Sequence, residues 1–206
     1  MIISDKQYQH YEKIMRNFIQ EHCIVKKTMP GKLPGTTYTW MFYLRNGLFN
    51  ADFLQYASEM MLYRLYEEIG SFKFQICGAE TAGTPLAASL PLIAKMNNIQ
   101  LGSFVVRKEQ KKYGLMNWHE GMVFKDIPYV LIDDLCNSSM SLKHADDICR
   151  NKLMIPSTNV AIVLVNKVNK EIHSEKRTKT DMYLPEDVKV ISLFDLDSFD
   201  LSNPSH

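Results

Sequence analysis

The feature that most constrains the fold of this chain is the alternation of short β-type runs with helical patterns beyond about residue 70. Runs rich in β-branched or aromatic residues cover residues 74–77, 102–106, 129–132, 160–165 and 188–193. Helical periodicity follows the first run, at residues 85–96, and the third, at residues 141–152. A strand, a crossover helix and a second strand are the unit from which parallel sheets are built. We therefore expect an α/β fold with a central, mainly parallel sheet flanked by helices.

The N-terminal part of the chain shows a different pattern. Apolar residues recur every three or four positions over residues 5–21, which predicts an amphipathic helix capped by Ser4. Residues 22–37 contain prolines and glycines that break both helical and strand periodicity. An aromatic-rich strand is expected at residues 38–44, and a long helix is expected from its cap at Asn50 to about residue 69.

Length and composition limit the organisation and the possible partners. A chain of 206 residues that is 46% apolar can fill one core, so we expect a single domain over residues 1–206, with an N-terminal segment (1–50) and a core (51–206). The 24 basic and 23 acidic residues nearly cancel, which gives no reason to expect direct binding to nucleic acid or membrane. The charged segment 167–180 is interpreted as a solvated loop or hairpin.

Localisation is inferred from the start of the chain and from its cysteines. The first residues lack the charge and apolar pattern of a signal peptide. The four cysteines lack the paired spacing of a zinc site or a redox motif. We therefore expect a cytoplasmic protein with reduced thiols.

The strongest chemical motif is the run over residues 129–141, in which an apolar strand leads into Asp133 and Asp134, a polar loop and a helix. Free amides at a helix N-terminus can bind a phosphate group. Adjacent carboxylates can accept hydrogen bonds from ribose hydroxyls, or can hold a hydrated Mg²⁺ through water. The alternative is that the two acids cap a turn, and the motif alone does not decide between these readings. The candidate ligand-binding residues of the loop are Asn137, Ser138, Ser139 and Ser141.

This motif resembles the phosphoribosyl-diphosphate motif of the type I phosphoribosyltransferase family. Three further stretches, in the same order, are similar to orotate phosphoribosyltransferase. Residues 42–50 resemble the base-binding strand and turn, residues 77–87 the pyrophosphate loop, and residues 107–114 the mobile catalytic loop. The resemblance implies the fold of that family, with residues 1–50 forming a hood over the base, and it implies Mg²⁺ as cofactor.

The resemblance also assigns roles to individual residues. Asp133, Asp134 and Lys111 become catalytic residues, and the two aspartates become the metal-binding pair. Lys111 would reach into the neighbouring subunit of a homodimer. The implied substrate-binding residues outside the polar loop are Tyr43, Arg45, Glu80, Thr81, Gly83, Arg107 and Lys108. Two alternatives stay open, since Tyr43 can be a core residue and the basic loop can be an exposed turn.

The chain departs from the family pattern at several of these positions. Residues 137–140 are Asn-Ser-Ser-Met where the family has Thr, a small residue, Gly and Thr. Thr81 and Ala82 replace Tyr-Lys, and Tyr113 and Leu115 replace a histidine and a glutamate. Glu80 adds a negative charge and Ala82 lacks the family's lysine, so together they are expected to weaken diphosphate binding by about 1.5–3 kcal/mol.

Two functions are therefore carried forward. The first is a Mg²⁺-dependent transferase or lyase that acts at the anomeric carbon of phosphoribosyl diphosphate or a nucleotide, with a nucleobase-like acceptor. The second is a catalytically altered regulator or effector of the same fold, for example in a bacterial retron antiphage system.

Overall fold

The structure is a computed structural model that describes residues 2–30, 37–112, 114, 116–167 and 184–202. Tyr113, Leu115 and the charged segment beyond Lys167 lie outside the described residues. Among the described residues, no helix is both long and apolar enough to cross a membrane.

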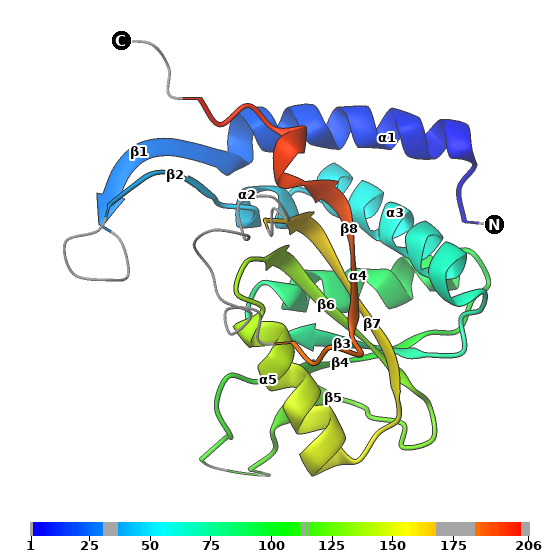
Figure 1. Ribbon diagram of the computed structural model, residues 1–206. Coiled ribbons are helices and arrows are strands. Elements are labelled where there is room, and N and C mark those ends of the chain that lie inside the picture. Colours follow the sequence, from blue (N-terminus) through cyan, green and yellow to red (C-terminus); the bar gives the residue numbers. More distant parts are fainter. Residues whose placement is uncertain (1, 31–36, 113, 115, 168–183, 203–206) are drawn as a thin grey trace.

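A six-stranded sheet in the order β5-β4-β3-β6-β7-β8 forms the centre of the molecule (Figure 1). Only the short β5 is antiparallel to its neighbour in this sheet, so the predicted α/β fold with a mainly parallel sheet is confirmed. The strands are β3 (Gln75–Ala79), β4 (Gly102–Val106), β5 (His119–Gly121), β6 (Tyr129–Cys136), β7 (Ser157–Asn166) and β8 (Lys189–Asp195).

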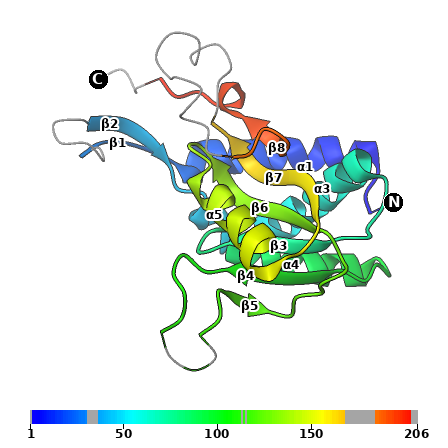
Figure 2. The ribbon, with the colours of Figure 1, turned by 60° about the horizontal axis from the view of Figure 1, so that its bottom comes forward.

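Helices cover both faces of the sheet. Helices α1 (Asp5–Phe18), α3 (Ala51–Ile69) and α4 (Gly83–Met96) pack on one face, and α5 (Met140–Ile148) packs on the other, where a π-helical turn (Cys149–Leu153) extends it (Figures 1 and 2). Helices α4 and α5 follow β3 and β6, as the sequence predicts.

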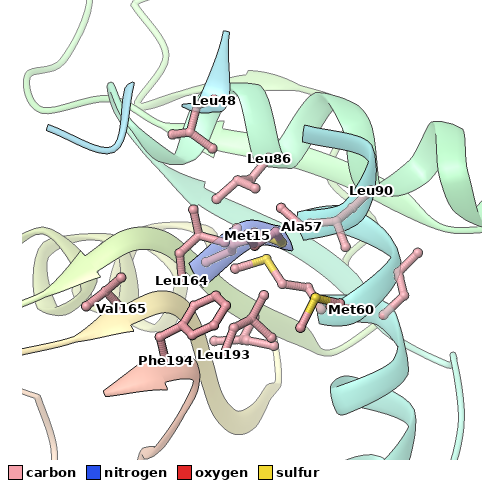
Figure 3. Close-up of a cluster of buried hydrophobic side chains, with 14 of the residues drawn as sticks. Met15, Leu48, Ala57, Met60, Leu86, Leu90, Leu164, Val165, Leu193 and Phe194 are labelled. Atoms are coloured by element: carbon pink, nitrogen blue, oxygen red, sulfur yellow. The ribbon is translucent and has the colours of Figure 1, made fainter. Parts of the chain in front are cut away.

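The strands bury both of their faces, as a sheet covered on two sides requires. In β6, Val130 and Ile132 join the apolar cluster under α1, α3 and α4, whereas Leu131 joins the cluster under α5. Figure 3 shows the first cluster, to which the N-terminal helix contributes Met15 and the last strand Phe194. This cluster therefore joins the two ends of the chain.

Both predicted helix caps are present. The Ser4 hydroxyl accepts a hydrogen bond from the Gln7 amide at 3.3 Å, and the Asn50 side chain accepts one from the Phe53 amide at 3.0 Å. The first helix is shorter than expected, because a π-helical turn (Ile19–Cys23) replaces its last residues.

The prediction of an irregular segment over residues 22–37 is partly wrong. Strand β1 (Ile24–Pro30) pairs antiparallel with β2 (Thr37–Phe42) in a hairpin that projects from the body of the molecule (Figure 2). The C-terminal segment braces this hairpin, since the Phe199 ring packs edge-on against Phe42 at 5.4 Å between centroids. Strand β2 ends before Tyr43, which precedes the short helix α2 (Arg45–Leu48).

Candidate functional site

The site lies where the chain connections of the sheet diverge. Strands β3 and β6 are neighbours, but the chain leaves β3 toward β4 on one side and leaves β6 toward β7 on the other. The loops after two such strands separate and leave a crevice at their carboxyl ends, which is the usual ligand site of open α/β sheets. Residues 80–82 follow β3 here, and residues 137–139 follow β6.

A cleft of about 1060 Å³ occupies this position. The β1–β2 hairpin forms its outer wall, and the two loops form its floor. Most of the residues proposed from the sequence line it: Tyr43, Arg45, Glu80, Thr81, Lys108, Asp133, Asp134, Asn137, Ser138, Ser139 and Ser141. Gly83, Arg107 and Lys111 are not among its lining residues.

The acidic pair lies inside β6 and not in a loop after it, because the strand runs to Cys136. Asp133 pairs with Val163 of β7, is only 7% exposed, and accepts a hydrogen bond from the Asp134 amide at 2.9 Å. Burial, and next the negative charge of Asp134, raise the pKa of Asp133 well above its usual range. Burial also raises the pKa of Asp134, although the nearby Arg45 opposes that shift. The pair therefore carries its charge at a cost that a bound cation or hydrogen-bond donors would reduce.

The polar loop places the first turn of α5 at the cleft. Ser139 adopts a left-handed conformation with φ of 63°, and its carbonyl accepts the Lys143 amide at 2.8 Å. The backbone N–H groups of the first turn, before Lys143, have no acceptor within the helix. No side chain caps the N-terminus of α5. Such a turn can hold an anion.

Ser139 stands where the family pattern has glycine, yet the backbone keeps the conformation that glycine adopts freely. For a residue with a side chain that conformation costs about 1–2 kcal/mol. The Ser139 hydroxyl lies 3.0 Å from the Cys136 sulfur.

The loop after β3 shows two kinds of residue. Glu80 and Thr81 line the cleft, and the peptide bond between them is cis. Gly83 is buried at the start of α4, where a Cβ atom would lie 2.8 Å from the carbonyl oxygen of Ile132. The close approach of α4 to β6 therefore accounts for this glycine, and a contact with substrate stays a prediction.

The β4–β5 loop carries four basic residues, and the three proposed from the sequence lie in different places. Lys108 lines the cleft. The Arg107 guanidinium instead pairs with Glu120 at 3.0 Å, and the Lys111 ammonium lies 3.9 Å from the same carboxylate. The catalytic role of Lys111, in this chain or in a neighbour, stays a prediction.

Sequence reasoning did not single out the residues on the hairpin wall. These are Met29, Pro30, Tyr38, Trp40, Met41 and Phe42. The Lys167 ammonium lies 4.4 Å from the centroid of the Trp40 ring, close enough for a cation–π contact. The aromatic-rich run at residues 38–44 was the available signal, but which of its side chains face the cleft depends on the hairpin register.

Among the described residues, no group of three or more acidic, histidine or cysteine side chains could hold a metal on its own. Mg²⁺ commonly uses one or two carboxylates together with water and phosphate oxygens from a substrate. The pair of Asp133, which is buried, and Asp134, which is half-buried, fits a metal that is bound in that shared way.

Comparison with solved structures shows that this chain has the type I phosphoribosyltransferase fold. Orotate phosphoribosyltransferase of Mycobacterium tuberculosis superposes with a TM-score of 0.68 at 13% identity, covering 91% of this chain and 98% of that one. A phosphoribosyltransferase from Corynebacterium diphtheriae gives 0.68 at 15% identity, covering 92% and 98%. The orotate phosphoribosyltransferase of Aeropyrum pernix gives 0.64 at 18% identity, covering 90% and 94%.

Sequence similarity points to the same group of proteins over a shorter range. The chain is 29% identical to orotate phosphoribosyltransferase of Aquifex aeolicus over 87 residues, which are 42% of this chain and 48% of the relative. The match thus spans about half of that relative. No protein-family model matches the chain.

Proposed function

We propose that the cleft binds phosphoribosyl diphosphate, or a ribose 5-phosphate or nucleotide, and that the chain transfers or cleaves a group at the anomeric carbon. The observation that carries the proposal is the convergence of an acidic pair, whose Asp133 is buried, and an uncapped helix N-terminus in one cleft at the switch point of the sheet. The acidic pair suits the ribose hydroxyls, and the helix N-terminus suits the phosphate group.

Relatives of the same fold support this choice of ligand. The M. tuberculosis enzyme has been solved in complex with 5-phospho-alpha-D-ribosyl 1-diphosphate, with a TM-score of 0.60 to this chain. An adenine phosphoribosyltransferase of Trypanosoma brucei, with a TM-score of 0.57, has been solved with AMP, pyrophosphate and ribose-5-phosphate. Apart from pyrophosphate, these ligands share a ribose 5-phosphate unit.

In the proposed complex the 5-phosphate binds the amides and hydroxyls of residues 137–141. Asp133 and Asp134 accept hydrogen bonds from the ribose hydroxyls, and they are the residues that would hold Mg²⁺ through water. Arg45 and Lys108 supply positive charge, and Tyr43 stands beside the acceptor. Bound Mg²⁺ would neutralise charge on the diphosphate.

The reaction breaks the bond between the anomeric carbon and the diphosphate, which leaves with the bonding electron pair. It forms a bond from that carbon to the acceptor or to water, whose proton passes to the diphosphate or to solvent. Positive charge develops on the ribose ring, and negative charge develops on the leaving diphosphate. The carboxylates of Asp133 and Asp134 stabilise the positive charge, and Lys108 and Arg45 stabilise the negative charge, because their positions are fixed before reaction.

Calorimetry with phosphoribosyl diphosphate tests the proposal. Asp133→Asn combined with Asp134→Asn should abolish Mg²⁺-dependent binding while the protein stays folded. The matched control is Glu67→Gln with Glu68→Gln on α3. It changes the net charge by the same amount but away from the cleft, so it should bind like the wild type. Undiminished binding by the folded Asp133/Asp134 variant would contradict the site assignment.

A second candidate is the catalytically altered regulator or effector, for example of a retron antiphage system, which binds a nucleotide without turnover. It is favoured by Glu80 and Ala82 at the pyrophosphate loop, and by the engagement of Arg107 and Lys111 with Glu120. Pyrophosphate release from phosphoribosyl diphosphate, measured with a panel of nucleobases, separates the two. Binding without release supports the regulator, and steady release supports the transferase.

A further inference from the structure

The peptide unit between Arg107 and Lys108 is held at both of its polar ends. Its N–H group, on Lys108, donates to the Glu80 carboxylate at 2.8 Å. Its carbonyl oxygen, on Arg107, lies 3.0 Å from Nε2 of His144. Because a carbonyl can only accept, Nε2 of His144 is the donor. The loop after β3 thus contacts one end of this peptide, and α5 contacts the other.

Holding one peptide plane at both ends fixes the backbone torsions on either side of it, and hence the directions of the flanking side chains. The Arg107 side chain leaves toward Glu120 on β5, outside the cleft. The Lys108 side chain enters the cleft, where its charge acts on the buried Asp133 and opposes the rise in that residue's pKa.

A smaller cavity of about 190 Å³ adjoins the cleft. Glu80, Lys108 and His144 all line it, together with Ser141 from the first turn of α5. The Glu80 amide also donates to the Val106 carbonyl at 3.0 Å. Glu80 is thus bound to the end of β4 by its amide and to the loop after β4 by its carboxylate. Its carboxylate is consequently engaged with the loop backbone as well as lining the cleft.

We infer that Glu80 and His144 are positioning residues that select Lys108, and not Arg107 or Lys111, as the cation of the β4–β5 loop that meets the anionic ligand. This inference rests on the proposed function for its ligand, a diphosphate or phosphate group, but the hold on the peptide is a property of the free protein. The accepting oxygen of Glu80 is thereby the means by which a positive charge is placed in the cleft.

Amide hydrogen exchange of the free protein tests the hold directly. Glu80→Gln keeps an oxygen that can accept the Lys108 N–H, whereas Glu80→Ala removes it. The Lys108 amide should exchange about tenfold or more faster in Glu80→Ala, as expected when a hydrogen bond to a charged group is lost, and within about threefold of wild type in Glu80→Gln. Equal exchange in the wild type and Glu80→Ala would overturn the inference.

Pyrophosphate titration then tests the selection of Lys108. Both Glu80 variants remove the same charge, so any difference between them reports on the hold alone. Glu80→Gln should bind pyrophosphate about tenfold more tightly than Glu80→Ala. In a Lys108→Ala background this difference should disappear, because the residue being positioned is absent. His144→Ala should weaken pyrophosphate binding when Lys108 is present and should have little effect in the Lys108→Ala background.

The outcomes separate the two proposals. Equal pyrophosphate affinity in Glu80→Gln and Glu80→Ala, or a difference that persists without Lys108, overturns the positioning role. If the wild type binds neither pyrophosphate nor phosphoribosyl diphosphate, the proposed function fails and the selection of a ligand cation fails with it. The exchange rates still decide in that case whether Glu80 holds the loop peptide.

Discussion

Replacing Asp133 with asparagine should stabilise the protein at neutral and alkaline pH while it abolishes ligand binding. The folded state raises the pKa of Asp133, chiefly by burial, above that of an aspartate in the unfolded chain, about 3.9. The folded protein therefore binds this proton more tightly than the unfolded chain does. As pH rises from about 4 through the folded pKa, unfolding releases a proton, and the free energy of unfolding falls.

The size of the effect follows from the shift. Each unit by which the pKa is raised lowers the stability at high pH by about 1.4 kcal/mol relative to a neutral residue. For a chain of this length, 1 kcal/mol corresponds to about 2–4 °C in Tm, so each unit is worth roughly 3–6 °C. Asparagine keeps the oxygen that accepts the Asp134 amide, so the variant loses the buried charge and keeps this hydrogen bond.

Thermal unfolding at pH 5 and pH 8, with a chelator present, measures the effect. Asp133→Asn should unfold at a higher temperature than the wild type at pH 8, and this difference in Tm should be smaller at pH 5. Asp126→Asn, at an exposed position, is the matched control and should show no such difference. A variant that is no more stable than the wild type at pH 8 would refute the reasoning that burial makes this charge costly.

Three further outcomes are expected. Gly83→Ala places a Cβ atom 2.8 Å from the Ile132 carbonyl oxygen, so it should lower the free energy of unfolding by about 1–3 kcal/mol in a denaturant titration; unchanged stability would remove the packing explanation. Asp146→Asn uncouples the fully buried carboxylate that lies 2.8 Å from Nε of Arg150, and should cost about 3 kcal/mol by the same measurement. If Lys111 serves a neighbouring subunit, mixing Lys111→Ala and Asp133→Asn chains should restore some activity, whereas a stable monomer in sedimentation would exclude that role.

The predicted strands agree with the structure where side-chain chemistry and burial point the same way. The run at residues 102–106 coincides with β4, because Phe104, Val105 and Val106 are residue types that favour a half-buried strand. Strand β6 was predicted to end near residue 132, since carboxylates are disfavoured in strands. In the structure, pairing of Asp133 and Leu135 with Val163 and Val165 of β7 carries β6 four residues further. Tertiary pairing thus outweighs local propensity at the acidic pair.

Two other elements could not be found from local pattern. Strand β5 has three residues, too few for any periodicity, and it exists through its pairing with Phe104, Val105 and Val106 of β4. Strand β1 contains two adjacent lysines and a register shift between Lys26 and Met29, so its alternation is interrupted.

The candidate site was predictable in its residue types and less so in its contacts. The acidic pair, the polar loop and the basic loop stand out because their composition is unusual beside apolar strands. The partner of Glu80 does not stand out, since it is a backbone amide 28 positions away. For the same reason, the sequence could not tell which of the loop cations faces the cleft.

The hydrogen bond between Glu80 and the Lys108 amide bears on the cation that the pyrophosphate loop lacks. From the sequence, Glu80 and Ala82 together subtract charge from the diphosphate site. In the structure Lys108 lines the same cleft as Ala82, and the Glu80 carboxylate holds the peptide unit that carries this lysine. If Lys108 replaces the cation lost at position 82, Ala82→Lys should recover most of the pyrophosphate affinity lost in Lys108→Ala, measured by titration with Mg²⁺ held constant. Thr84→Lys, which introduces the same charge at the exposed second residue of α4, is the control and should recover less. Equal recovery by the two substitutions would mean that the cleft responds to overall charge, and that neither position 82 nor Lys108 marks a specific diphosphate contact.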